Sequence, residues 1–253
     1  MIKPSTPRLR LALYASLCSS LLLPGCAFWT AEAPQDKPPQ VLRQLPLQFS
    51  AQDKSQWQVM RLPGKLLTAY RVAPQGTRDA LLAEADSSAS MLRQALHIPP
   101  EQLGKLQFDW RVDQLITGAD MRQRETEDSP VRLILVFEGD RQHFSAQNNL
   151  LSELTLSLTG EPLPYATLMY VWCNDCPAGS VIVNPRTDRI RKLAVESGAG
   201  RVGQWLSYRR DIRADFEKAF GEPPGALLGL AIMTDTDNTR STSRAWYGAI
   251  RLQ

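Results

Sequence analysis

The sequence predicts a mainly β fold, a jelly-roll-like antiparallel β-sandwich with one main α-helix at about residues 204–220. Three observations support this prediction. Apolar and polar residues alternate with a period of two over many short stretches, Gly, Pro, Asn and Asp separate these stretches, and helical spacing is clear in one segment. Many strands and a single helix favour a sandwich over alternating strand–helix units.

The clearest predicted strand runs from Leu106 to Asp113. Its even-numbered residues are apolar and share one face, while its odd-numbered residues are polar and share the other, as in a strand with one buried side. We predict further strands over residues 66–72, 80–85, 131–138, 166–172, 180–183, 190–196, 227–233 and 245–252.

One segment, Gln204 to Phe220, breaks the period-two pattern. Large apolar residues recur in it at helical spacing, at positions 208, 212, 216 and 220. Gly221 and the prolines at 223 and 224 provide the stop that a helix end needs. We expect the aromatic stripe of this helix to pack in the core.

The first 25 residues have the features of a signal peptide. Three basic residues, Lys3, Arg8 and Arg10, precede an apolar run from Leu11 to Leu23. The run is shorter than the roughly twenty residues that a membrane span needs. Without residues 1–25 the formal net charge falls by these three cations, from +3 to 0, so the charge gives no reason to expect a nucleic-acid partner.

The residues Leu23-Pro24-Gly25-Cys26 resemble the lipobox of bacterial lipoproteins. The resemblance implies cleavage before Cys26, acylation of this cysteine and attachment to a membrane. Ala27 in the next position implies the outer membrane, with the protein facing the periplasm. An ordinary secretory signal, cut near residues 27–31, is the alternative. We predict that the proline-rich residues 26–46 form a tether and that residues 47–253 form a single β-sandwich domain.

Two cysteines remain in the predicted domain, Cys173 and Cys176. In an oxidising compartment such a pair is expected to form a disulfide. Their Trp-Cys-x-x-Cys pattern also occurs in thioredoxin-like proteins, which makes thiol–disulfide exchange an alternative function. An apolar strand follows Cys176, however, so the helix dipole that activates a thiol in those proteins has no counterpart here.

Asp235, Asp237 and Asn238 lie close together after an apolar strand. Their side-chain oxygens are of the kind that Ca²⁺ prefers, so a structural calcium ion is one prediction for them. The spacing is not that of an EF-hand, because Arg240 stands where that loop needs glycine. The alternative is a turn in which these side chains accept backbone hydrogen bonds.

Five residues are candidates for ligand binding: Trp246, Tyr247, Asp109, Arg111 and Asp113. Trp246 and Tyr247 are adjacent on a predicted strand, so they point to opposite faces and one of them is a candidate for exposure. Asp109 and Asp113 flank Arg111 on one strand face, which favours a ladder of opposite charges. The candidates for a catalytic pair of carboxylates, as in glycoside hydrolases, are Glu84, Asp86, Asp109, Asp113 and Asp120.

Several motifs resemble a bacterial family known as the domain of unknown function 3047. They include Phe-Asp-Trp-Arg-Val-Asp at 108–113, Thr-Asp-Thr-Asp-Asn-Thr at 234–239 and Ala-Trp-Tyr-Gly at 245–248, and the likeness extends from about Trp57 to Ile250. It implies a jelly-roll sandwich related in shape to carbohydrate-binding modules. It implies no activity and no functional residues, and the Cys-x-x-Cys after Trp172 departs from it.

Together these observations predict a membrane-anchored, non-enzymatic envelope lipoprotein that binds a ligand or has a structural role. Glycan is the favoured ligand class, and an envelope protein is the other candidate partner. A hydrolase of envelope glycans that uses two carboxylates is the first alternative. Thiol–disulfide exchange through Cys173 and Cys176 is the second.

Overall fold

The computed structural model describes residues 45–50 and 57–253. Cys26, the predicted signal peptide and most of the predicted tether lie outside these residues, so the predictions made for them stay predictions. Among the described residues, no helix has the length and apolar character that crossing a bilayer requires.

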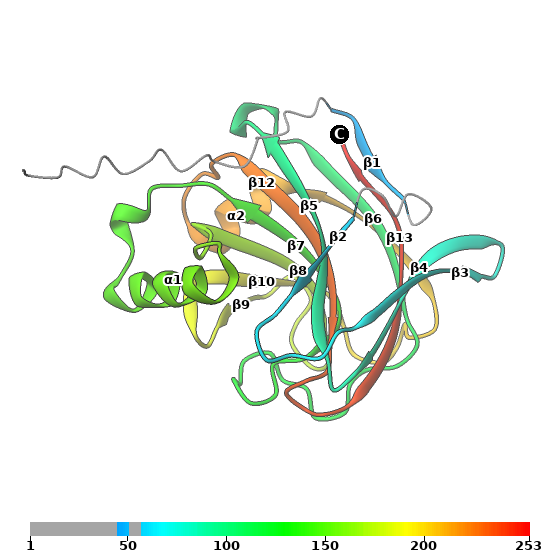
Figure 1. Cartoon of the computed structure of the whole chain (residues 1–253). Coiled ribbons are helices and arrows are strands. Elements are labelled where there is room, and N and C mark those ends of the chain that lie inside the picture. The colour runs from blue at the N-terminus through cyan, green and yellow to red at the C-terminus, as the bar shows by residue number, and fades with distance from the viewer. Residues whose placement is uncertain (1–44, 51–56) are drawn as a thin grey trace, which may run out of the picture. The chain divides into compact units, whose positions relative to one another are not determined.

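The described strands form two sheets that face each other (Figure 1). The first sheet has six strands, in the order β11-β6-β13-β4-β3 with β1 paired to β13, and all of its pairs are antiparallel. Its strands are β1 (Leu47–Phe49), β3 (Ala69–Gln75), β4 (Arg78–Asp86), β6 (Lys105–Val112), β11 (Trp205–Asp211) and β13 (Thr242–Leu252).

The second sheet has seven strands, in the order β2-β5-β12-β7-β8-β10-β9, and only the pair of β8 and β10 is parallel. Its strands are β2 (Gln58–Arg61), β5 (Ala89–Ile98), β7 (Ser129–Phe137), β8 (Ala166–Cys173), β9 (Val181–Asn184), β10 (Thr187–Ser197) and β12 (Leu227–Asp235). The predicted β-sandwich is confirmed, whereas β1, β2, β5 and β11 have no predicted counterpart.

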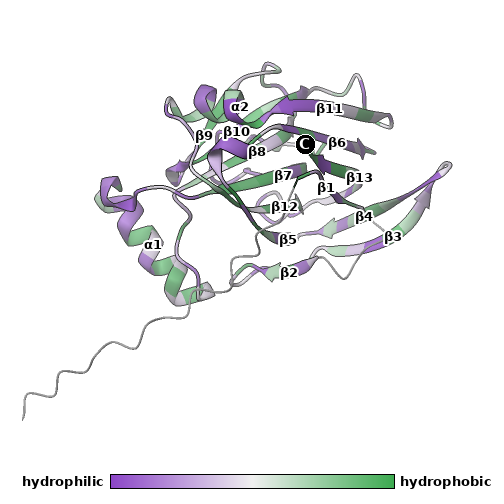
Figure 2. Cartoon of the chain, turned by 90° about the horizontal axis from the view of Figure 1, so that it is seen from above, coloured by the Kyte–Doolittle hydropathy of each residue, from purple (hydrophilic) through white to green (hydrophobic). Residues whose placement is uncertain are grey.

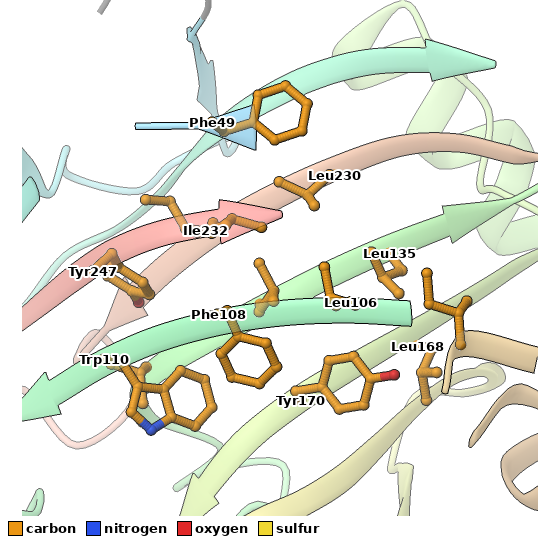
Figure 3. Packing of buried hydrophobic residues seen from close by; sticks show 14 of the residues in the cluster. Phe49, Leu106, Phe108, Trp110, Leu135, Leu168, Tyr170, Leu230, Ile232 and Tyr247 are labelled. Atoms are coloured by element: carbon orange, nitrogen blue, oxygen red, sulfur yellow. The ribbon is translucent and has the colours of Figure 1, made fainter. Parts of the chain in front are cut away.

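Large aromatic residues pack between the two sheets. The ring of Phe108 on β6 lies 4.9 Å from that of Trp110, and it stacks at 5.6 Å on Tyr170 of β8 in the other sheet. Tyr208 of β11 stacks on the same phenylalanine at 5.3 Å. Figure 3 shows Phe108, Trp110 and Tyr170 in this core. The alternation in β6 therefore places its apolar side inside the sandwich and its polar side outside, as predicted.

The helix α2 (Ile212–Phe220) confirms only the second part of the helix predicted for residues 204–220. Residues 205–211 pair with β6 as β11 instead, so tertiary pairing decides this stretch. Asp211 begins the helix, because its carboxylate accepts a hydrogen bond from the Ala214 N–H at 3.0 Å. Phe216 packs 4.7 Å from Phe137 of β7, so the aromatic stripe lies in the core as expected.

A second helix, α1 (Ala146–Thr159), is an addition to the single helix that the sequence predicts. Its polar and apolar residues are mixed along the chain (Figure 2), and its leucines face solvent, with exposed fractions of 68% for Leu150, 52% for Leu154 and 58% for Leu158. The apolar period that marks a core-facing helix is therefore missing. Two short 3-10 helices, Pro100–Gln102 and Arg141–His143, complete the described elements.

Candidate functional site

The outer face of the six-stranded sheet carries a row of side chains from three neighbouring strands. Trp205 of β11 lies opposite Arg111 of β6, and Arg111 lies opposite Trp246 of β13. Residues paired across strands point to the same side of a sheet. We call this surface the tryptophan face. It consists of these three residues, of the outward-pointing Asp109 on β6, and of Asp113, which follows the end of β6.

The tryptophan face unites four of the five predicted ligand-binding residues, namely Asp109, Arg111, Asp113 and Trp246. Tyr247 is the exception, because it points into the core and is 2% exposed. Its hydroxyl donates to the Met233 carbonyl at 2.6 Å, and burial raises the pKa of this hydroxyl. The prediction for Tyr247 is therefore wrong, since Trp246 takes the outward position on β13.

Trp205 provides the indole ring that a ligand on this face would meet. It is partly exposed, whereas Trp246 is 6% exposed and packs beneath the surface. The guanidinium of Arg78 lies 4.6 Å from the centre of the Trp205 ring. Gly248 leaves room for this arrangement, because a Cβ there would lie only 2.9 Å from the Cβ of Asp109 and 3.4 Å from the Trp205 ring.

Trp205 is not among the five ligand-binding candidates, because the sequence identifies it only as one of several aromatic residues that could stack on a sugar if they faced outward. It falls within the predicted helix, where an aromatic residue is expected to pack in the core. In the structure, Leu206 is buried while its neighbours Trp205 and Ser207 are more exposed. This short alternation is the pattern of a strand and is the one local sign that Trp205 faces outward.

The charged residues of the tryptophan face pair with one another. Arg111 Nε donates to Asp113 Oδ1 at 3.1 Å, and the Ser207 hydroxyl donates to Asp109. Arg78 Nη1 lies 3.9 Å from Asp109 Oδ2. The pair of Arg111 and Asp113 is made along the chain, and only the contacts of Asp109 with Ser207 and Arg78 join different strands, so the predicted cross-strand ladder is limited to these. The contacts hold polar groups in fixed places along the outer side of β6.

A hollow of about 240 Å³ opens at one end of the tryptophan face. It is lined by Glu84, Ala85, Gln114, Thr242, Ser243 and Arg244. Gln114 follows Asp113 in the chain, so the hollow adjoins the face. The Ser243 hydroxyl is buried and has no hydrogen-bond partner among the described residues. Ser243 shares the inward side of β13 with Ala245 and Tyr247, so its side chain points away from the tryptophan face.

Four of the five carboxylates that the sequence offers for hydrolysis lie beside arginines, namely Glu84, Asp109, Asp113 and Asp120. Hydrogen bonds from Arg244 at 2.9 Å and Arg71 at 3.2 Å lower the pKa of Glu84. A hydrogen bond from Arg122 at 2.8 Å does the same to the pKa of Asp120. A general acid for glycoside hydrolysis needs a pKa raised towards neutrality, so these two acids are poorly suited to donate a proton.

The predicted calcium ligands lie elsewhere, at the end of β12. One carboxylate oxygen from each of Asp128, Asp235 and Asp237 lies within 4.8 Å of the other two, a donor set that suits a hard cation. Asp128 belongs to a distant part of the chain, which the sequence analysis does not connect with this site. Both oxygens of Asp235 already accept hydrogen bonds from Arg132, at 2.8 Å each.

The third predicted calcium ligand, Asn238, contacts the carboxylate of Asp128 through its backbone N–H. Its N–H donates to Asp128 Oδ1 at 3.2 Å, and the Thr239 N–H donates to Asp128 Oδ2 at 2.7 Å. The turn that is the alternative to calcium thus has backbone hydrogen bonds to a carboxylate, but the acceptor is the distant Asp128 and not one of the three predicted residues.

Acidic and basic side chains balance each other around this site. We call these residues the ion cluster: Glu127, Asp128, Asp235, Asp237, Lys65, Arg132, Arg186 and Lys192. Four carboxylates and four cations give a formal sum of zero. The protein's own cations thus already compensate the acids, and a calcium ion would add two charges to a balanced cluster.

Lys192 is the most deeply buried cation of the ion cluster, with an exposed fraction of 0%. Its Nζ lies 2.7 Å from Glu127 Oε1 and donates to the Met121 carbonyl at 2.9 Å. Burial and the nearby charge of Arg132 lower the pKa of Lys192 to about 8. Burial raises the pKa of Asp235 to about 6, although the guanidinium of Arg132 opposes this shift. Both groups are charged at neutral pH.

Cys173 and Cys176 form the predicted disulfide, with their Cα atoms 5.7 Å apart. Both residues are buried, at 4% and 3% exposure, and they pack with Met121 and Ile182. The strand β9 follows them instead of a helix. Thiol–disulfide exchange requires access to a sulfur atom, so this environment favours a structural role for the disulfide.

A family model described as "Protein of unknown function (DUF3047)" matches residues 55–251 of the chain. A comparison with curated proteins found no match.

Several solved structures are similar to the chain. The family 11 carbohydrate-binding module of a cellulosomal cellulase from Clostridium thermocellum has a TM-score of 0.40 and 8% identity, over 82% of this chain and 93% of the module. A low-affinity xylan-binding module from Roseburia intestinalis has a TM-score of 0.32 and 10% identity, over 83% and 96%. The K1 cleaved adhesin domain of Lys-gingipain from Porphyromonas gingivalis has a TM-score of 0.37 and 12% identity, over 83% and 98%. Likenesses of this size identify neither a ligand nor an activity.

Because the ion cluster is balanced, we expect calcium to have little effect on stability. The melting temperatures in millimolar CaCl₂ and in EDTA should differ by less than about 1 °C, since only an ion that binds the folded state raises stability. Differential scanning calorimetry measures this difference. A clear rise in CaCl₂ that EDTA reverses would show that the three aspartates bind the ion after all.

The substitution Lys192→Met should lower the free energy of unfolding by roughly 3 kcal/mol at neutral pH, because it removes one partner of a buried ion pair. The free energy of unfolding of the wild-type protein should also rise between about pH 8, the pKa of Lys192 in the folded state, and about pH 10.5, its ordinary pKa in the unfolded chain. In this range the unfolded chain binds more protons than the folded protein, so a rise in pH favours the folded state. The variant should lack this gain. Urea unfolding across this pH range measures both effects.

The matched control is the double substitution Glu127→Gln with Lys192→Met, which removes both charges of the pair. It should be more stable than Lys192→Met alone, because no carboxylate is left without its buried partner. Equal stability of the wild type and Lys192→Met would contradict the role assigned to this residue.

Proposed function

The chain belongs to the DUF3047 family, and from this premise we propose that it binds glycans, without catalysing a reaction on them, through its tryptophan face. The observation that carries the proposal is the partly exposed indole of Trp205, with polar side chains in fixed places beside it. Sugar rings have apolar C–H faces that stack on indole rings and hydroxyl groups that need hydrogen-bond partners.

The cover over Trp205 is compatible with ligand entry. Arg78 lies 4.6 Å from the ring centre, and its side chain is 49% exposed. A cation–π contact at an exposed site contributes only about 1 kcal/mol. A sugar ring can therefore replace the guanidinium at a small cost, and Arg78 then remains free to bind a sugar hydroxyl.

The polar groups beside the indole supply both kinds of hydrogen-bond partner. Arg111 provides donors, and the carboxylates of Asp109 and Asp113 provide acceptors. The hollow beyond Asp113 adds the polar side chains of Gln114, Glu84 and Arg244. A ligand that extends from Trp205 on β11 to this hollow beside β13 and β4 crosses β6, so an oligosaccharide fits the arrangement better than a single sugar.

We further propose that the protein is anchored by acylated Cys26 to the outer membrane and faces the periplasm. The lipobox resemblance supports this anchor. At full extension, residues 26–46 reach about 70 Å, so the domain could contact envelope glycans up to that distance from the bilayer. Two or more acyl chains make such an attachment stable.

The substitution Trp205→Ala should weaken glycan binding at least about tenfold, because it removes the stacking ring. A glycan array identifies the oligosaccharide that the wild-type protein binds, and titration calorimetry then measures its affinity for the variant. Trp205→Phe should retain most of the binding, because it keeps an aromatic ring at this position.

The matched control is Tyr165→Ala. Tyr165 is also a partly exposed aromatic residue under an arginine, with Arg189 at 5.0 Å from its ring, but it lies outside the tryptophan face. The proposal fails if the wild-type protein binds no glycan on the array, or if Trp205→Ala and Tyr165→Ala have equal effects on binding.

For the anchor, Cys26→Ser should release the protein from the membrane fraction, because no acyl chain can then be attached. Cys18→Ser is the matched control and should leave the protein in that fraction, since residue 18 lies within the predicted signal peptide. Cell fractionation with mass spectrometry of the mature N-terminus measures both. Membrane attachment of the Cys26→Ser protein would contradict acylation at this residue.

A further inference from the structure

Three methionines form a row across the outer face of the seven-stranded sheet. Met60 of β2 lies opposite Met91 of β5, and Met91 lies opposite Met233 of β12. Their chain neighbours Leu92 and Ile232 belong to the main core, so the methionines point away from it. We call these three residues the methionine row. It lies on the other sheet from the tryptophan face.

The geometry of the row allows its sulfur atoms to approach one another. Residues that lie opposite on antiparallel strands have Cβ atoms about 5 Å apart, and the long, unbranched methionine side chain readily adapts to its surroundings. The Met60 side chain leans over β5, where Arg93 Nη1 lies 3.7 Å from its sulfur. Met91 packs against the buried cluster that contains Met233. Met91 therefore occupies the centre of the row.

The surroundings of the row are accessible and electrically balanced. Met60 and Met91 are partly exposed, and Met233 is 8% exposed. Each of the two arginines beside it binds a carboxylate: Arg93 binds Glu161 at 2.6 and 2.7 Å, and Arg132 binds Asp235 at 2.8 Å. Neither arginine leaves an uncompensated positive charge that would repel a cation.

We propose that the methionine row binds a soft monovalent cation, Cu(I) or its analogue Ag(I), through its three thioether sulfurs. Thioethers are soft ligands that select such ions over hard cations such as Mg²⁺ and Ca²⁺. A rigid sheet holds the three side chains on neighbouring strands, which reduces the cost of assembling the site. Thioethers have no proton to lose, so binding does not vary with pH as it does for histidine or cysteine ligands.

The test uses the full-length chain in detergent, with Cys18→Ser and Cys26→Ser so that no free thiol competes for the ion. Ag(I) is the probe, because it does not oxidise in air. The ion should bind once per chain, with equal affinity at mildly acidic and neutral pH. In NMR spectra of methyl-labelled methionine, the signals of the methionine row should shift. The signal of Met121, which packs in a different cluster, should not.

The decisive variant is Met91→Leu, which removes the central sulfur and should weaken Ag(I) binding at least about tenfold. Leucine has a similar volume, so the fold should persist, and the partly exposed Met60 provides a second variant, Met60→Leu. The matched control is Met121→Leu, because Met121 packs in a different buried cluster, and it should bind Ag(I) like the parent protein. The proposal is overturned if the parent protein does not bind Ag(I), or if Met91→Leu and Met60→Leu bind it as tightly as Met121→Leu.

Discussion

The buried contact between Arg132 and Asp235 joins two strands of the seven-stranded sheet to the loop that precedes β7. It links the ends of β7 and β12, and the same arginine donates to the Glu127 carbonyl at 2.7 Å. Asp235 also accepts the Ser129 N–H at 3.1 Å, so the pair fixes the place where the loop before β7 enters the sheet. Loss of either partner would leave the other charged and buried, which is far more costly than loss of an exposed pair.

This contact explains why the loop before β7 can cover the outer side of β8 and β10. Glu127 connects the pair to Lys192 of β10, and Lys192 holds the Met121 carbonyl of the loop. Both sides of the sheet are therefore covered here, and Val171 and Ala194 are as inaccessible on the outer side as Tyr170 is on the inner side. A strand covered on both sides reads as a continuous apolar run, which is what residues 166–172 show.

The sequence predicts the sandwich well because most of its strands follow one of two simple patterns. In β6 the period of two determines which side chains face outward, so Asp109, Arg111 and Asp113 are correctly placed on one surface. The choice between Trp246 and Tyr247 needs the register of β13 with its neighbours, because both side chains are compatible with a core position. Alternation alone cannot resolve that choice.

Other features depend on contacts between distant parts of the chain. Asp128 and Asp235 meet only after folding, so their cluster has no local sequence signal. Helix α1 turns its leucines outward, and β5 contains the polar residues Arg93 and Gln94 within its length, so neither has the expected apolar pattern. Trp205 is assigned to a helix because helical and strand spacing overlap in this aromatic segment, and pairing with β6 decides between them.

The core of the sandwich is filled with side chains, so the two surfaces proposed to bind ligands lie on its outside. The two sheets differ strongly in what they present there. The tryptophan face combines an indole with charged groups that pair with one another, whereas the methionine row is neutral and polarisable. A single fold of this kind can therefore offer two chemically unlike surfaces without a deep cavity.

The β3–β4 hairpin has a consequence for how such a protein can diverge. Residues 78–80, at the start of β4, pair only with β3, and here the hairpin extends away from the rest of the sheet (Figure 1). Arg78 at the base of its turn is nevertheless the residue that covers Trp205. In evolutionary terms, changes in the length or composition of this tip leave the packed sheets untouched but alter what lies over the indole. Relatives with the same scaffold could therefore acquire different ligand preferences through a few residues that contribute little to folding.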